Sequence, residues 1–148
     1  MERIEACISF LLGKAYQQVQ QASKQRLAPH GVTPVQYGLL RVLSERDGQN
    51  GAELGERLQL DSATITGLLD RLERAGLIER RADDQDRRVN RIFATAQARK
   101  LQPALDRAMD EVDAAFLADF GPAEAVRLRG QLAQLGKVAD RRGATANE

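Results

Sequence analysis

The chain is poor in the residue types that build disulfides, metal sites and active sites. Its 148 residues include one cysteine, Cys7, and one histidine, His30. An intramolecular disulfide, a cysteine-based zinc cluster and a multi-histidine metal site are therefore excluded. With no glycine-rich phosphate loop either, little chemistry is left to assemble, which argues against an enzyme. We expect no metal, no cofactor and no catalytic residues.

The chain also lacks an excess of one charge and a long apolar run. Its 22 basic and 21 acidic residues leave a net charge of +1, so the overall charge does not indicate an indiscriminate nucleic-acid binder. The apolar run Ala6–Leu12 is too short to span a membrane. It follows Glu2 and Glu5 and precedes no convincing cleavage site, unlike a signal peptide. The sequence predicts a cytoplasmic protein with no membrane partner.

What the chain does have is helical periodicity, beginning with a long amphipathic segment. Apolar residues repeat on one helical face from Ile4 to Val19, which predicts a helix over Glu2–Leu27. Thr33 and Gln36 then form a capping-box pattern around a proline, which predicts a second helix over Pro34–Glu45. The segment that follows, residues 46–51, has the composition of a loop.

Two further helices lie close together in the sequence. The pattern predicts a short helix over Ala52–Leu58, a tight link, and a second helix over Ser62–Ala75 capped by Asp61 or Ser62. The apolar residues of the second helix converge on one side, and its opposite face near the N-terminus is small and polar. Such a face suits insertion into the major groove of DNA. We expect Asp70 to lie past the contact zone, paired with Arg71 or Arg74.

A predicted β-hairpin follows this helix pair. Gly76 ends the helix, and short strand-like runs over Leu77–Ala82 and Val89–Thr95 flank the charged tip Asp83–Arg88. An arginine at such a tip can enter the minor groove, and a carboxylate two residues away can fix its rotamer. Asp86 and Arg88 have that spacing.

Together these elements predict a helix-turn-helix with a wing, which reads double-stranded DNA. The candidate DNA-binding residues are Ser62, Ala63, Thr64, Thr66, Gly67, Arg71, Arg74, Asp86, Arg87 and Arg88. Two other interpretations stay open: the tip is only a solvated turn, or the winged helix is a protein-interaction module. An acidic or apolar recognition face would favour the module, whereas the threonines and arginines favour DNA.

The C-terminal third predicts two more helices, each with an apolar stripe. One stripe runs from Leu101 to Phe116, and the other comprises Leu128, Leu132, Leu135 and Ala139. A winged helix closes its own core within about 60 to 70 residues, so these stripes, with the first helix, leave apolar surface to cover. Self-association into a two-fold dimer is the economical explanation, because it would set two copies of the helix-turn-helix and its wing, the reading heads, about 34 Å apart on a palindromic site. The alternative is that the terminal stripes pack on each other within one chain.

Four motifs carry a resemblance to a known family: Gly31–Tyr37, Leu60–Glu73, Gly76–Arg80 and Asp83–Arg88. With them the chain resembles the MarR-type (multiple-antibiotic-resistance) regulators over nearly its whole length. The resemblance implies a mainly α fold with a small β-hairpin wing: a winged helix at 32–98 flanked by dimerisation helices at 1–31 and 99–148, in one domain. The family pattern makes Arg88 the minor-groove arginine and Asp86 its orienting partner. Two departures, Ala94-Thr95 and Ala98, lie outside the reading head.

The resemblance also implies a small ligand bound between the dimerisation part and the DNA-binding part. Tyr16 and Tyr37 are expected near the meeting point of the first two helices, Gly13 leaves space there, and Arg41 could neutralise an acid. The candidate ligand-binding residues are Ser9, Gly13, Tyr16, His30, Tyr37 and Arg41. An aromatic acid or its coenzyme A thioester is the expected class, and core packing of both tyrosines is the alternative.

Redox sensing through Cys7 is a further alternative. In the peroxide-sensing branch of the family, the reactive cysteine would fall at Ser9 and its tyrosine partners at Ser23 and Pro34, and none of these matches. Cys7 lies on the apolar stripe of the first helix, which favours a buried structural thiol. The sequence therefore predicts a homodimeric repressor that binds a pseudo-palindromic operator and is released by a small effector.

Overall fold

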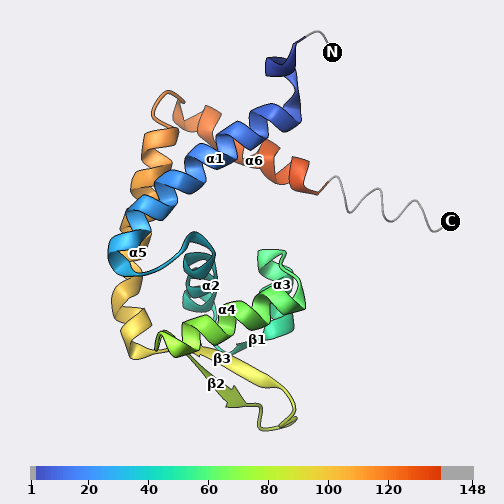
Figure 1. Cartoon of the computed structure of the whole chain (residues 1–148), viewed down its shortest axis with the longest axis vertical. Helices are drawn as coiled ribbons and strands as arrows, with labels where there is room; N and C mark the ends of the chain where they lie inside the picture. Colours follow the sequence, from blue (N-terminus) through green and yellow to red (C-terminus); the bar gives the residue numbers. More distant parts are fainter. Residues whose placement is uncertain (1–2, 138–148) are drawn as a thin grey trace, which may run out of the picture. The chain divides into compact units, whose positions relative to one another are not determined.

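The computed structural model describes residues 3–137, which form helices and one small sheet (Figure 1). The elements in chain order are η1 (Ile4–Ala6), α1 (Ile8–Leu27), η2 (Ala28–His30), α2 (Pro34–Glu45), β1 (Gln49–Asn50), α3 (Gly51–Leu58), α4 (Ser62–Arg74), β2 (Ile78–Ala82), β3 (Asn90–Ala94), α5 (Ala96–Phe116) and α6 (Pro122–Gly136). The predicted mainly α class with a β-hairpin wing is confirmed. The chain divides after Val112 into two compact units.

The first helix begins later than its apolar periodicity predicted. Cys7 has an extended backbone, with φ −72° and ψ 121°, and it separates the short η1 from α1. The apolar residues Ile4, Ile8 and Leu11 are exposed, whereas burial on α1 is confined to Ser23 and Leu27 near its C-terminal end. The apolar stripe is present on the helix, but most of its residues are exposed to solvent in this chain.

Capping side chains set where the next two helices start. Thr33 and Gln36 make the predicted capping box at α2. A second capping box at α3 was not predicted: the Asn50 side chain accepts from the Glu53 amide at 2.9 Å, and Glu53 accepts from the Asn50 amide. Each box satisfies two amides that the first helical turn leaves without partners.

The sheet is antiparallel with strand order β1-β3-β2. Strands β2 and β3 form the predicted hairpin, with Arg80 opposite Ile92. Strand β1 lies in a segment predicted as loop, because a two-residue strand is too short for an alternating pattern. Its Gln49 is buried, and the side-chain amide donates to the Val42 carbonyl at 3.3 Å.

The main core lies in the first unit and joins the winged helix to α1 and α5. Helix α5 contributes Ala98, Leu105 and Ala108 to the same buried cluster as Leu27 and Leu72. The C-terminal stripe therefore also closes the core of the reading head, beyond the dimerisation role expected of it. The largest fully buried side chains are Leu27, Leu39, Leu40, Leu43, Leu54, Leu68, Leu72, Ile92 and Leu105.

The second unit contains the end of α5 and the helix α6. Arg129 on α6 pairs with Asp113 at 2.9 Å, and Ala125 is buried. Five large apolar side chains are exposed here, namely Phe116, Phe120, Val126, Leu132 and Leu135. Ala139, the last member of the predicted stripe, lies outside the described residues. Within residues 3–137, no helix is both long and apolar enough to cross a bilayer.

Candidate nucleic-acid interface

The start of α4 is organised by Asp61. Its carboxylate accepts from the Thr64 amide at 2.7 Å and from the Thr64 hydroxyl at 3.0 Å. These hydrogen bonds favour the charged carboxylate and lower the pKa of Asp61. The sequence left the cap open between Asp61 and Ser62, and the structure makes it Asp61.

Both threonine hydroxyls of α4 donate hydrogen bonds to groups at the N-terminal end of the same helix. The Thr64 hydroxyl donates to Asp61, and the Thr66 hydroxyl donates to the Ser62 carbonyl at 2.8 Å. Both side chains are exposed, so their oxygens are left to accept hydrogen bonds from outside. The exposed face at this end of α4 therefore presents acceptors, which can pair with the amino groups of adenine or cytosine in a major groove.

The arginines of α4 are on the surface. Arg71 and Arg74 are exposed, and no ion pair among residues 3–137 involves either of them. A Cβ placed on Gly67 would stand 3.4 Å from an Arg71 guanidinium nitrogen. Gly67 therefore lets the Arg71 guanidinium lie over the helix, one turn towards its N-terminal end.

Asp70 does not hold Arg71 or Arg74, contrary to expectation. It pairs with Arg80 on β2 at 2.7 Å, and Arg80 also pairs with Glu73 at 3.0 Å. The chain reverses at Gly76, whose φ of +72° is left-handed, and the reversal carries β2 back against α4. A neighbour supplied by such a reversal cannot be found from helical spacing alone.

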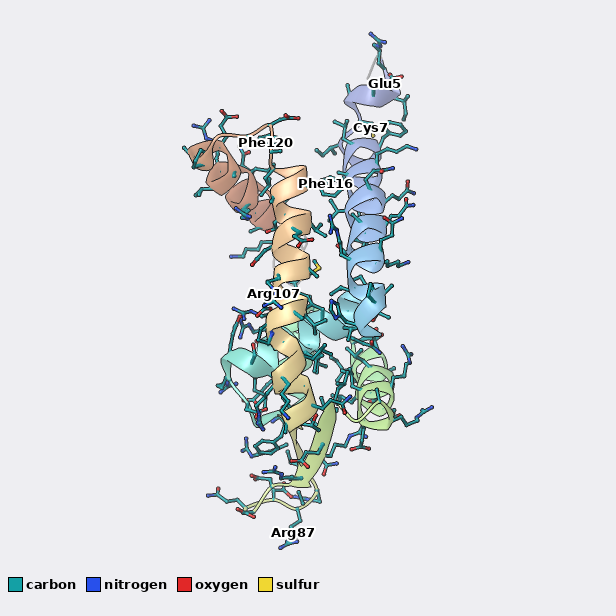
Figure 2. The ribbon with its side chains drawn as sticks, turned by 90° about the vertical axis from the view of Figure 1, so that its left-hand side faces the viewer. Glu5, Cys7, Arg87, Arg107, Phe116 and Phe120 are labelled. Carbon is teal, nitrogen blue, oxygen red and sulfur yellow. The ribbon has the colours of Figure 1, made fainter. Side chains whose placement is uncertain are left out.

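The tip of the wing carries the predicted Asp86–Arg88 pair. Asp86 Oδ1 accepts from Arg88 Nε and from the Arg88 backbone amide, both at 3.1 Å. The Arg88 side chain is 92% exposed, so the carboxylate directs it without covering it. Figure 2 shows the neighbouring Arg87 at the free end of the hairpin, pointing away from the ribbon.

A second ion pair, which the sequence did not suggest, holds the base of this tip. Arg91 on β3 contacts Asp83 at 2.6 Å and donates to the Gly48 carbonyl at 3.0 Å. The Arg91 hydrogen bond lowers the pKa of Asp83. Asp83 also accepts from the Asp86 amide at 3.2 Å, so the pair fixes the loop on which Asp86 and Arg88 lie.

The candidate ligand-binding residues do not converge on one cavity within the chain. Ser9, Gly13 and Tyr16 lie on exposed turns of α1, and a Cβ on Gly13 would meet nothing within 4 Å. His30 lines a surface hollow between the end of α1 and α5. Tyr37 and Arg41 lie on α2, and both are engaged by Asp106 on α5.

Asp106 links α2 to α5 through several contacts. It accepts from the Tyr37 hydroxyl at 3.1 Å, from Arg41 at 3.2 Å and from Gln102 at 2.9 Å. Burial and the Asp106 charge raise the pKa of Tyr37 to about 12. Arg41 also pairs with Glu45 at 3.7 Å, so its charge is already compensated by two carboxylates.

A cavity of about 520 Å³ lies beside these residues, between α2 and the first half of α5. Its apolar wall includes Leu40, Leu43 and Pro103, the last of which is a proline inside α5. Its polar groups come from Arg41, Ser44, Asp47, Arg99, Gln102 and Asp106. The lining therefore combines an apolar wall with several groups that can form hydrogen bonds.

Cys7 is not the buried thiol that its place on the apolar stripe predicted. It is partly exposed, and its sulfur lies 3.1 Å from the Ser9 hydroxyl. That hydrogen bond lowers the pKa of the Cys7 thiol, with smaller contributions from the backbone amides at the start of α1. Its exposure follows that of the stripe as a whole, because the neighbouring Ile4 and Ile8 are also exposed in this chain.

Comparison with known proteins gives one consistent family. A model of the MarR family matches residues 32–89. The HTH-type transcriptional regulator TtmR of Methylorubrum extorquens is 37% identical over 71% of the chain, which spans only 54% of TtmR. The transcriptional regulator HosA of Escherichia coli O111:H- is 31% identical over 72% of the chain and 83% of HosA.

Solved structures agree over most of the chain. A probable transcriptional regulator from Pseudomonas aeruginosa is 32% identical with a TM-score of 0.84, covering 90% of this chain and 99% of that one. CouR from Rhodococcus jostii RHA1, bound to p-coumaroyl-CoA, is 27% identical with a TM-score of 0.82, covering 91% and 95%. MepR from S. aureus, in a complex with DNA, is 27% identical with a TM-score of 0.81, covering 87% and 96%.

Proposed function

The chain belongs to the MarR family of transcriptional regulators, and from that premise we propose that it represses transcription as a homodimer bound to a pseudo-palindromic operator. It is accordingly a regulator rather than an enzyme. The observation that carries the proposal is the exposed end of α4 together with the Arg88 side chain held by Asp86. These two features supply a helix for the major groove and a cation for the minor groove.

In the proposed complex, the first two turns of α4 enter the major groove and the wing tip follows the neighbouring minor groove. Ser62, Ala63, Thr64, Thr66 and Gly67 form the face that approaches the bases, and their small size allows close contact. Arg71 and Arg74 extend that face and reach bases or phosphates. Arg87 and Arg88 contribute the wing's positive charge, directed by Asp86. The exposed acceptors and free guanidiniums argue against the protein-interaction module.

Replacing Arg88 tests this reading head. Arg88→Ala should weaken operator binding by about 1 to 3 kcal/mol and lower the salt slope of the affinity by about one. The measurement is a fluorescence-anisotropy titration at several salt concentrations. Arg107→Ala is the matched control, because Figure 2 shows Arg107 on α5, far from the wing tip where Arg87 lies. Equal affinities for the parent and Arg88→Ala would remove the wing from the mechanism.

We propose the cavity between α2 and α5 as the effector site. Its guanidiniums, Arg41 and Arg99, are paired with Asp106 and Asp47 of the same lining, so an acidic effector would compete with these ion pairs. Its apolar wall suits an aromatic ring. CouR, 27% identical, binds p-coumaroyl-CoA, which supports an aromatic acid or its thioester as the class to test. Benzoate derivatives and p-coumaroyl-CoA would be titrated into the operator complex. Release by one of them from the parent but not from Arg41→Met would support the site, and equal release from both would exclude Arg41.

A redox-responsive repressor is the second candidate, because Cys7 is partly exposed and its thiol pKa is lowered. A low pKa raises the fraction of reactive thiolate. The test is operator binding after mild peroxide treatment. Loss of binding in the parent but not in Cys7→Ser would favour this candidate, and insensitivity of both proteins would exclude it.

A further inference from the structure

Arg80 joins the wing to the recognition helix through its side chain. It lies in the middle of β2, and its two terminal nitrogens contact Asp70 Oδ1 at 2.7 Å and Glu73 Oε1 at 3.0 Å. Asp70 and Glu73 are three residues apart on α4, so their carboxylates lie on one face of the helix. The forked guanidinium thus contacts two carboxylates about one turn of α4 apart.

The Arg80 guanidinium is better protected from solvent than the other ion-paired arginines of the wing. The Arg80 side chain is 22% exposed, whereas Arg88 is almost fully exposed. Arg80 lines a hollow between α4 and the hairpin, together with Thr66, Leu69 and Ile92. An ion pair in such a setting is screened less by salt and has a more defined geometry than an exposed pair.

The other ion pairs of the hairpin do not reach α4. In the described part of the chain, Arg81 pairs with Glu79, Arg88 with Asp86 and Arg91 with Asp83, all within residues 79–91. They fix the hairpin internally. The backbone turn at Gly76 and the buried residues Ile78 and Ala94, which face each other in the register, anchor the hairpin at its base. Arg80 adds a side-chain tie to α4 closer to the tip.

We propose that Arg80 is a positioning residue that sets the distance and angle between α4 and the wing, so that both reach the DNA together. The inference rests on the proposed function, because it assigns Arg80 a role in a two-element reading head. Arg80 itself touches no DNA: its guanidinium is occupied by Asp70 and Glu73. Without it the wing tip samples a wider range of positions, and Arg88 loses part of its contribution to binding.

A double-mutant cycle measures this dependence. In the parent, Arg88→Ala should weaken operator binding roughly 5- to 150-fold. In an Arg80→Met background, we expect Arg88→Ala to have an effect smaller by about threefold or more, because the wing is no longer held at a fixed distance and angle to α4. An equal effect of Arg88→Ala in both backgrounds would overturn the inference.

Two controls separate positioning from charge. Arg81→Met removes an arginine from the next position of β2 without cutting a tie to α4, and it should leave the effect of Arg88→Ala unchanged. Arg80→Met combined with Asp70→Asn and Glu73→Gln removes the carboxylates that Arg80→Met exposes to the DNA phosphates. If this triple variant recovers the full effect of Arg88→Ala, Arg80 acts by neutralising charge and the positioning role is refuted.

A distance measurement without DNA tests the tie independently of the proposed function. Spin labels at Ser62→Cys on α4 and Gln85→Cys at the wing tip, in a Cys7→Ser background diluted with unlabelled protein, report the α4-to-tip distance. We expect a narrow distribution in the parent and in Arg81→Met, and a broad or shifted one in Arg80→Met. An unchanged distribution in Arg80→Met overturns the inference even if the protein binds its operator. A parent that binds no operator DNA would instead refute the proposed function, while the distances still decide whether Arg80 holds the wing.

Discussion

At the scale of single residues, carboxylates organise both the reading head and the proposed effector site. Asp61 caps α4, Asp86 directs Arg88, and Asp106 gathers two side chains of α2. The pairing of Asp86 with Arg88 and the choice of Asp61 or Ser62 as the cap of α4 could be predicted, because the partners lie two or three residues apart. The partners of Asp70 and Asp106 lie on other elements, so helical periodicity could not reveal them.

The Tyr37–Asp106 contact predicts a contribution to stability that depends on pH. The pKa of Tyr37 is raised to about 12, against about 10 in an unfolded chain. Folding therefore favours the neutral phenol, and this stabilisation is complete below about pH 10 and lost as the pH rises towards 12. In a Tyr16→Phe background, which leaves one tyrosine, ultraviolet titration should show ionisation near pH 12.

Asp106→Asn in the same background removes the charge that opposes phenolate formation, so the ionisation should move to lower pH. Asp110→Asn serves as the matched control, because Asp110 contributes the weakest of the contacts that raise this pKa. Identical titrations for the parent and Asp106→Asn would show that the Asp106 carboxylate does not control the phenol.

At the scale of elements, the sequence predicted helices and the hairpin well and short or interrupted segments poorly. Long runs such as α2, α4 and α5 repeat their apolar pattern often enough to be recognised. Strand β1 contains two residues and η1 contains three, which is too few for any period. The same limit explains why a single continuous helix was predicted across Cys7, where the structure has the short η1 followed by α1.

The capping box at α3 predicts a specific loss of stability. Asn50→Ala removes the acceptor for the Glu53 amide and should lower the free energy of unfolding by about 0.5 to 2 kcal/mol. Asn50→Ser retains a capping oxygen and should recover most of that loss. Urea denaturation followed by circular dichroism measures both. A serine variant as unstable as the alanine variant would show that the loss does not come from the capping oxygen.

At the scale of the whole molecule, exposed apolar side chains predict the proposed dimer. The sequence identified apolar stripes on the terminal segments, and the structure leaves residues of both α1 and α6 exposed. Two-fold association would cover such surfaces and fix two reading heads relative to each other. The sequence could not show that the first half of α5 is committed to the core of the reading head, because periodicity does not say which neighbour covers a face.

A charge on α6 should therefore disrupt the assembly. Leu132 is 45% exposed, and Leu132→Glu should shift the protein from dimer to monomer because a carboxylate would be buried without a partner. Sedimentation velocity measures the shift, and affinity for a full operator should fall with it. Gln131→Glu adds the same charge at the next position of α6 and should stay dimeric. A Leu132→Glu protein that sediments as the parent does would place the interface elsewhere.

Helix α5 contributes to the core of the first unit and carries a proline, Pro103, in that part of its length. Its 21 residues make a rod about 32 Å long, and a helix resists stretching. Pro103 cannot donate its backbone hydrogen bond to the Arg99 carbonyl, so the rod is weakest at this point. That weak point borders the cavity between α2 and α5. A molecule that fills the cavity would contact α5 beside this missing hydrogen bond.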